Sequence, residues 1–454
     1  MSRATPTDTK MDAPPRLAVD RLLDDPQTRI VVCCGAGGVG KTTTAAALGV
    51  RAAERGRKVV VLTIDPARRL AQSMGIDSLD NTPRRVKGVQ GPDGGELHAM
   101  MLDMKRTFDE IVEGHSDPER AQAILANPFY QSLSAGFAGT QEYMAMEKLG
   151  QLRARDDWDL IVVDTPPSRS ALDFLDAPGR LGSFLDGKFI RVLMAPAKVG
   201  GRAGMKFLNV GMSMMTGTLS KLMGASLLKD VQTFVAAMDT MFGGFRTRAD
   251  ATFQLLQAPG TAFLVVSAPE PDALREAAYF VERLAAERMP LAGLVLNRVH
   301  GSGADQLSAE RALAAAENLE EGRIVDQESG KAGLRDSTDA DADTDSATDP
   351  AARAGRETDA IDADVPDVDA EHAADHVADA DADADVDEIT AGLLRLHAER
   401  MQVIAREQRT RDRFTSLHPE VAVVEVAALP GDVHDLAGLR AIGERLAAGV
   451  PAGA

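Results

Sequence analysis

Short runs of β-branched and aliphatic residues alternate with helix-prone segments along most of the chain. The apolar runs, each long enough for one buried strand, lie at 30–34, 58–64, 97–102, 158–164, 261–267, 291–297 and 421–426. The segments between them are rich in alanine or carry apolar residues at helical spacing, most clearly at 17–25, 43–54, 108–126, 141–155, 271–288, 308–321, 389–412 and 435–447. This alternation predicts an α/β fold with a doubly wound, mostly parallel sheet.

One connection in this pattern is much longer than the others. Nearly a hundred residues separate the run at 158–164 from the run at 261–267, whereas a parallel crossover needs only about a dozen. We therefore expect an inserted helical subdomain at about 176–258. Within it, residues 194–241 hold 8 of the 18 methionines, and amphipathic spacing relates Met205, Leu208, Met212 and Met215 and then continues to Met241. Such stripes suit a surface for varied apolar partners, or equally packing against one another or the sheet.

The net charge of −19 is concentrated in one segment. Residues 326–388 contain 22 acidic and 4 basic residues, a net of −18, which leaves −1 for the rest of the chain. Because this segment has few large apolar side chains, we expect it to be a disordered insert at the tip of a hairpin made by its flanking helices. The predicted organisation is a disordered leader (1–15), a core (16–325) completed by 389–448, and a short tail (449–454).

Several classes of protein are disfavoured by composition. No basic tract indicates nucleic-acid binding, and no apolar stretch of about 18 residues or signal-peptide core is present. The only cysteines, Cys33 and Cys34, are adjacent on one predicted strand, so they should point to opposite faces and form no disulfide. These features favour a cytoplasmic protein without a transmembrane segment, which could still contact a membrane peripherally.

The most informative motif follows the first strand. Gly35 and the group Gly40-Lys41-Thr42 have the spacing G-x-x-x-x-G-K-[ST], in which backbone N–H groups surround a phosphate and the lysine reaches the outer phosphates. Thr42 would hold a magnesium ion. A glycine turn that matches by chance is disfavoured, because a strand precedes the motif and a helix follows it, so that the helix N-terminus faces the anion.

Two aspartates and one asparagine end other predicted strands. Asp65 follows the second strand, where it could meet the γ-phosphate or its attacking water, or could simply cap a helix that begins at Pro66. Asp164 ends the strand at 158–164, as expected for an acid that meets magnesium directly or through water, and Thr165 begins a candidate γ-phosphate sensor loop. Asn297 could bind an adenine edge or be an ordinary turn residue.

In this order, the P-loop, Asp65-Pro66-Ala67, Asp164-Thr165-Pro166-Pro167, the helical insertion and Asn297 resemble the ArsA family of ATPases. That family belongs to the deviant-Walker-A class of P-loop NTPases and comprises arsenical-pump ATPases and targeting factors for tail-anchored membrane proteins. The resemblance covers about residues 28–325 and 389–448 and is greatest to actinobacterial anion-transporter-type ATPases.

The resemblance implies an ATPase that uses ATP and Mg²⁺. The nucleotide-binding residues would be Gly35, Gly37, Gly38, Val39, Gly40, Lys41, Thr42 and Thr43, with Asn297 at the adenine. Lys41 and Asp65 would be catalytic, Asp65 by polarising the attacking water, and Thr42 and Asp164 would hold the metal. The methionine-rich helices from Met205 to Met241 would form a groove for the apolar helix of a client.

Three departures from the family pattern narrow the function. The family's signature lysine, which reaches the phosphates of the dimer partner, would fall at Ala36. No C-x-x-C pair is present to bridge a dimer through zinc, and no thiol triad exists to bind arsenite.

Three hypotheses remain for the function. The chain is an ATP-driven switch that acts as a dimer on an apolar client or membrane protein, a soluble energising subunit of an anion efflux system, or a nucleotide-binding partner of a lysine-bearing paralogue.

Overall fold

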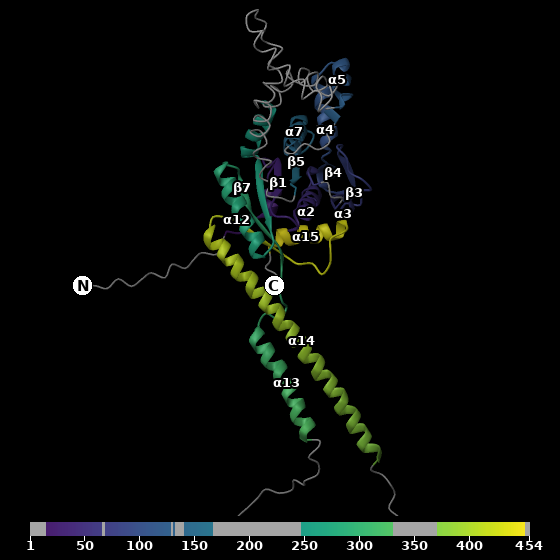
Figure 1. The fold of residues 1–454 in the computed structure, drawn as a ribbon, viewed down its shortest axis with the longest axis vertical. Coiled ribbons are helices and arrows are strands. Elements are labelled where there is room, and N and C mark those ends of the chain that lie inside the picture. Colours follow the sequence, from purple (N-terminus) through teal and green to yellow (C-terminus); the bar gives the residue numbers. More distant parts are fainter. Residues whose placement is uncertain are drawn as a thin grey trace, which may run out of the picture. The chain divides into compact units, whose positions relative to one another are not determined.

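The computed structural model describes residues 15–65, 69–128, 130–131, 140–166, 247–329 and 370–449 (Figure 1). Within these residues one eight-stranded sheet has the order β3-β4-β2-β5-β1-β6-β7-β8, and every neighbouring pair is parallel except β3 with β4. The strands are β1 Ile30–Cys34, β2 Lys58–Thr63, β3 Arg84–Gln90, β4 Glu96–Met101, β5 Leu160–Asp164, β6 Thr261–Ser267, β7 Leu291–Val299 and β8 Val423–Ala427. The predicted doubly wound, mostly parallel α/β fold is confirmed.

Helices cover both faces of the sheet. One hydrophobic layer is made with α1 (Val19–Asp24), α2 (Lys41–Glu54), α3 (Arg69–Ser73) and α15 (Leu436–Ala448). The other is made with α4 (Met104–His115), α5 (Pro118–Leu125), α7 (Thr140–Arg155), α12 (Pro271–Ala286) and the helical residues 247–257. A short 3₁₀ turn, Pro92–Gly94, joins β3 to β4.

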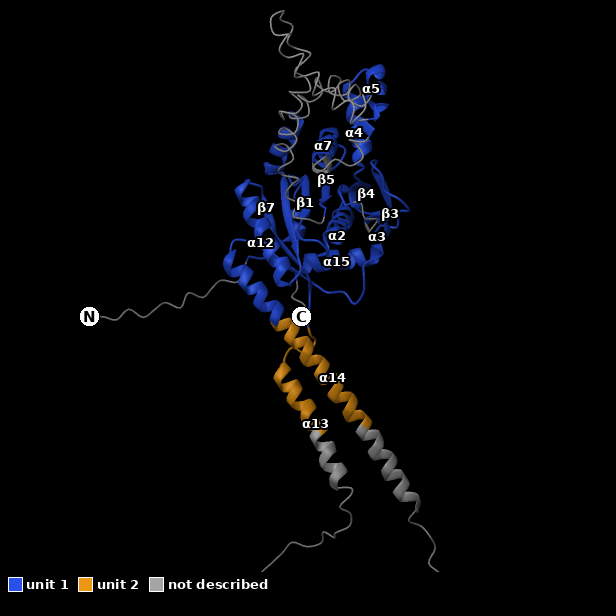
Figure 2. Cartoon of the chain, in the orientation of Figure 1, with its two compact units in different colours: residues 1–301, 406–454 blue, residues 302–405 orange. Residues whose placement is uncertain are grey.

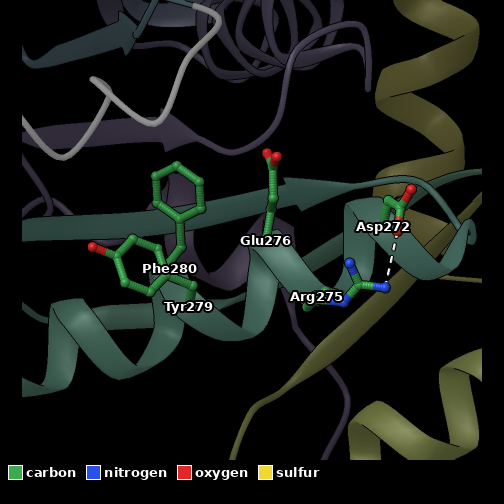
Figure 3. A pocket seen from close by; sticks show the side chains of 5 residues that line it. All are labelled: Asp272, Arg275, Glu276, Tyr279 and Phe280. Atoms are coloured by element: carbon green, nitrogen blue, oxygen red, sulfur yellow. Dashed lines mark ion pairs between the residues drawn. The ribbon is translucent and has the colours of Figure 1, made fainter.

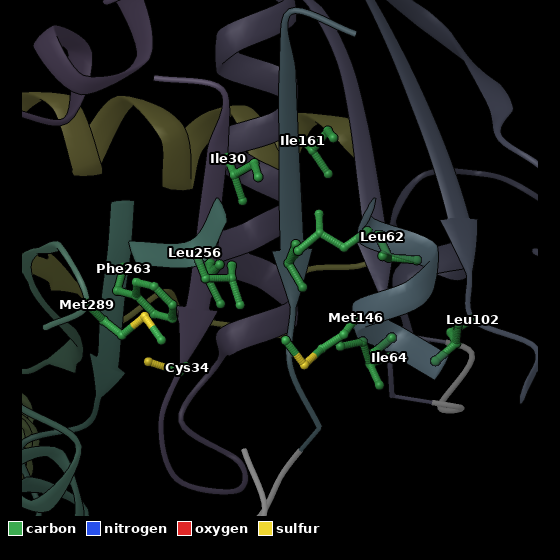
Figure 4. Close-up of a cluster of buried hydrophobic side chains, with 14 of the residues drawn as sticks. Ile30, Cys34, Leu62, Ile64, Leu102, Met146, Ile161, Leu256, Phe263 and Met289 are labelled. Atoms are coloured by element: carbon green, nitrogen blue, oxygen red, sulfur yellow. The ribbon is translucent and has the colours of Figure 1, made fainter. Parts of the chain in front are cut away.

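Alternate residues of β1 supply opposite layers, as the strand periodicity of two requires. Ile30, Val32 and Cys34 lie in the layer of α12, part of which Figure 4 shows, whereas Val31 and Cys33 lie in the layer of α2. Both cysteines are buried and free. The prediction that the two cysteines point to opposite faces of the sheet is confirmed.

Most predicted elements are present with boundaries that shift by a few residues, but one predicted helix is divided and one strand was not predicted. The single helix expected at 108–126 is two helices, because Asp117 caps a new helix through the Arg120 N–H and Pro118 occupies its first position. Strand β3 was not predicted. Its sequence RRVKGVQ is mostly polar, since it is an edge strand with only Val86 and Val89 buried.

The acidic insert 326–388 is expected to lack regular structure, and at its two ends the flanking helices continue into it. Helix α13 is Ala309–Ser329 and α14 is Ala370–Leu417, so residues 326–329 and 370–388 are helical. Alanine, which alternates with aspartate in this part of the chain, has the highest helix propensity and outweighs the weaker preference of aspartate. Most of the leader, the segment 330–369 and the methionine-rich residues Met205–Met241 lie outside the described residues.

Residues 302–405 form a compact unit separate from the unit of 1–301 and 406–454 (Figure 2). In the smaller unit α13 and α14 run side by side, as the predicted hairpin requires. Arg395 pairs with Glu320 at 2.6 Å, and the ring of His397 bonds the Leu307 carbonyl at 2.8 Å. Fully buried alanines lie on both helices, which indicates a close-packed seam, at Ala312, Ala316, Ala391 and Ala398.

Arg57 connects three segments at the amino-terminal edge of the larger unit's sheet. Its guanidinium donates hydrogen bonds to the carbonyls of Leu23 (2.9 Å), Thr28 (2.7 Å) and Asp159 (2.5 Å). Partial burial lowers the Arg57 pKa, although the group stays charged at neutral pH. The side chain therefore satisfies main-chain acceptors that precede β1 and β5.

We expect Arg57→Ala to lower the free energy of unfolding by about 2 to 4 kcal/mol, because several partly buried carbonyls lose a charged donor. Urea titration of the nucleotide-free protein measures this. Arg84→Ala is the matched control, since the Arg84 side chain is exposed and pairs with the exposed Asp80, and the substitution should leave stability almost unchanged. Equal losses of unfolding free energy for the two substitutions would contradict a stabilising role of the Arg57 hydrogen bonds.

Candidate functional site

The carboxyl ends of β1, β2 and β5 meet beside the start of α2. Strand β5 lies between the other two, and the register places Asp164 next to Cys33 on one side and Thr63 on the other. Ligands of open parallel sheets bind at such carboxyl ends, where the strand order reverses. The loop 35–40 leads from β1 directly into α2, so the predicted phosphate-binding turn lies at this edge.

Two glycines of the loop are required by close contacts. Gly35 has φ +146°, and a Cβ there would lie 2.0 Å from the Val266 carbonyl oxygen of β6. Gly40 has φ +97°, and a Cβ there would lie 2.3 Å from Nδ2 of Asn297. Both positions therefore admit only glycine, and the loop is held between β1 and the ends of β6 and β7.

Lys41 is buried at the first position of α2. Its Nζ donates a 2.7 Å hydrogen bond to the Ala36 carbonyl, within the same loop. Burial lowers the Lys41 pKa, and the neighbouring Asp164 and Asp65 oppose that shift. The ammonium group thus lies inside the turn and would have to exchange the carbonyl for a phosphate oxygen when an anion binds.

Asp164 is the most strongly perturbed acid of this edge. Its side chain is fully buried, and the hydroxyls of Thr42 and Thr63 both donate to Oδ2 at 2.8 Å. Among the described residues the other oxygen, Oδ1, is buried and has no hydrogen-bond partner. Burial raises the pKa of this carboxyl from 3.8 to about 6, and the two hydroxyl bonds only partly offset the rise.

These residues fit a magnesium ion. A buried carboxylate oxygen without a partner is uncommon and is costly unless a cation or donor meets it. Mg²⁺ prefers oxygen ligands and is commonly held by one or two protein groups together with substrate phosphates. Among the described residues no group of three or more histidine, cysteine or acidic side chains could hold a metal. The Thr42 hydroxyl and the Asp164 carboxylate are the candidate ligands because they lie together beside the phosphate loop and Oδ1 of Asp164 is buried. Thr63 was not predicted, and its only sequence signal is its place two residues before Asp65.

Asp65 and Asn297 lie on either side of this centre. Asp65 follows β2, is partly exposed, and is near enough to influence the pKa of both Lys41 and Asp164. Asn297 is buried on β7 and donates from Nδ2 to the Val39 carbonyl at 2.8 Å. The structure therefore brings both predicted residues to the phosphate loop, although Asn297 contacts the loop itself rather than an open surface.

Thr165 anchors the segment that follows β5. Its hydroxyl donates to the Cys33 carbonyl at 2.9 Å, which ties this segment to the end of β1. The next residues of the predicted sensor loop, from Pro167 onward, and Pro66 to Arg68 after Asp65 lie outside the described residues.

A separate cavity of about 520 Å³ lies along α12 (Figure 3). Its described lining residues are Asp272, Arg275, Glu276, Tyr279 and Phe280, with an ion pair of 2.9 Å between Arg275 and Asp272. None of them is a predicted site residue. The chemistry expected from the sequence is gathered at the phosphate loop instead.

Comparison with known proteins agrees with this geometry. The family model of anion-transporting ATPases, ArsA_ATPase, matches residues 28–324, which include β1, the loop, Asp65, Asp164 and Asn297. The chain belongs to this family. It is accordingly an ATP-binding enzyme that hydrolyses ATP.

Individual relatives in this comparison share only a modest sequence identity with the chain. The chain is 30% identical to the ATPase GET3 of Malassezia globosa over 39% of this chain and only half of the relative. It is 25% identical to the ATPase GET3 of Podospora anserina over 64% of this chain and 80% of the relative. It is 23% identical to the ATPase ASNA1 homolog 2 of Paramecium tetraurelia over 61% and 78% of the two chains.

The loop geometry gives a direct prediction. Gly35→Ala should lower the free energy of unfolding by about 2 to 4 kcal/mol, because the new methyl group overlaps a main-chain oxygen of β6. Gly38→Ala is the control. It also has a positive φ of +76° but open space around its Cβ, so it should cost only about 1 kcal/mol. Urea unfolding without nucleotide compares them, and a Gly38→Ala effect as large as that of Gly35→Ala would contradict the packing argument.

Proposed function

We propose that this ATPase is a magnesium-dependent switch that couples its nucleotide state to a membrane-protein client. In this proposal Lys41 and the loop from Gly35 to Thr43 hold the phosphates, while Thr42 and Asp164 hold the metal. The observation that carries this proposal is the Asp164 carboxylate, in which two hydroxyls bond Oδ2 while Oδ1 is buried and has no partner among the residues that the structure describes.

Each group has a defined chemical task in the proposed reaction. Bound Mg²⁺ would neutralise charge on the phosphates, as in other phosphoryl-transfer enzymes. Lys41 would leave the Ala36 carbonyl for the outer phosphates. Asp65, at the end of β2, would orient and polarise the attacking water, and Asn297 would lie toward the base while it supports Val39.

The client is proposed from the family and the sequence. The ArsA family includes targeting factors for tail-anchored membrane proteins, and the relatives above carry the names ATPase GET3 and ATPase ASNA1 homolog. The methionine-rich helices expected between Met205 and Met241 would supply a deformable apolar surface. In the described residues no helix is long and apolar enough to cross a bilayer.

A second proposal concerns the catalytic partner. Position 36 is a buried alanine whose carbonyl is bonded to Lys41, where the family signature has a lysine that acts across a dimer. Without that cation the chain could depend on a paralogue that contributes it, in a hetero-dimer, rather than on a second copy of itself.

The test is steady-state ATP turnover with Mg²⁺ for the wild type and Asp65→Asn. We expect Asp65→Asn to bind ATP within about threefold of the wild type but to turn it over at least about a hundredfold more slowly, because the amide cannot polarise water. Asp157→Asn is the matched control, since Asp157 is exposed before β5, at the opposite edge of the sheet.

The outcomes separate the proposals. Turnover of Asp65→Asn equal to that of the wild type would remove the catalytic role of Asp65. If both proteins bind ATP and neither turns it over, the self-sufficient enzyme is excluded, and the lysine-bearing partner becomes the explanation.

A further inference from the structure

Helix α14 carries two apolar faces within the unit 302–405. The first contains the alanines Ala391 and Ala398, which are buried in the seam with α13. The second is an exposed stripe of large side chains, Val386, Ile389, Leu393, Leu396 and Val403, whose exposed fractions run from 37% to 63%. Because leucine and isoleucine side chains rarely form an exposed row on a helix, this second face indicates a docking surface.

The stripe has the spacing of a coiled coil. Its residues are separated by three and four positions in turn, and Arg400 takes the place that continues the pattern before Val403. Alternation of three and four is the a and d pattern of a heptad repeat. Since α13 already covers the opposite face, the stripe is available to a helix from outside this hairpin.

The order of residues makes the stripe complementary to itself in the antiparallel direction. With two copies centred between Leu393 and Leu396, the layers pair Leu393 with Leu396, Val386 with Val403, and Ile389 with Arg400 of the second copy. Every apolar residue then meets an apolar side chain or the aliphatic stem of Arg400.

The charged residues favour antiparallel over parallel pairing of the two stripes. A parallel pair would place Arg400 against Arg400 of the second copy inside the seam, which is repulsive. It would also align the acidic start of the stripe, Asp385, Asp387 and Glu388, with itself. The antiparallel pair instead brings Asp385 alongside Arg406 of the second copy, at the flanking positions where coiled coils form interhelical ion pairs.

We propose that the exposed stripe of α14 binds the same stripe of a second copy of this chain, as an antiparallel coiled coil. This interface is independent of the nucleotide site and of the function proposed above. It joins two chains through their hairpins whether or not ATP is bound.

Cross-linking of the full-length, nucleotide-free protein tests the direction. The native Cys33 and Cys34 are buried, so an introduced cysteine supplies the accessible thiol. We expect chains with Val386→Cys and chains with Val403→Cys to form a disulfide-linked dimer when mixed under mild oxidation, and neither to do so alone. As a control, Glu388→Cys mixed with Gln402→Cys should not cross-link, because both side chains are exposed but off the stripe.

Analytical sedimentation measures the affinity of one copy of the chain for another. Leu393→Glu with Leu396→Glu should weaken self-association at least about a hundredfold, since four apolar side chains per dimer are replaced by charges. The double substitution Gln402→Glu with Gln408→Glu is the control, because it adds the same charge outside the stripe and should change the self-association affinity little. Asp385→Lys should weaken the dimer, and addition of Arg406→Glu in the same chain should restore it.

Two results would overturn the proposal. Cross-linking of Val386→Cys chains with one another, without the Val403→Cys chain, would show a parallel pair. A monomer at about 100 µM with no cross-link in the mixture would show that a different molecule, or another segment of this chain, covers the stripe.

Discussion

The buried carboxylate of Asp164 is the constraint on which the candidate site depends. It lies on β5 between β1 and β2, and two threonine hydroxyls from α2 and β2 bond one of its oxygens. Burial of a charge is costly unless it is compensated. Strand β5, helix α2 and strand β2 are therefore joined by a buried carboxyl group whose charged form a cation near its second oxygen would favour further, and this relates the packing of the sheet to the binding of metal.

The conformation of the phosphate loop is also fixed by contacts within the protein. Lys41 bonds the Ala36 carbonyl, Asn297 bonds the Val39 carbonyl, and Gly35 leaves room for no side chain beside β6. The loop thus has its donors arranged before a nucleotide binds, which lowers the reorganisation that binding requires. In the proposed mechanism the main rearrangement is the exchange of one acceptor of Lys41, from a carbonyl to a phosphate.

The sequence predicted the strands that carry the site because each is a buried, continuous apolar run with a polar residue at its end, as at Asp164 and Asn297. It did not predict β3, whose polar face meets solvent at the sheet edge, or the role of Thr63, which only the register of β2 with β5 reveals. The acidic segment before Ile389 was expected to be unstructured because it has few large apolar side chains. Its alanine content instead favours the helix observed in α14.

A crystal structure of the full-length protein with Mg²⁺ and a non-hydrolysable ATP analogue would test the central claim most directly. We expect Mg²⁺ bound by the Thr42 hydroxyl and by Oδ1 of Asp164, directly or through one water, and Lys41 moved from the Ala36 carbonyl to the outer phosphates. A nucleotide bound with Lys41 still on that carbonyl, or a metal away from Asp164, would contradict the account.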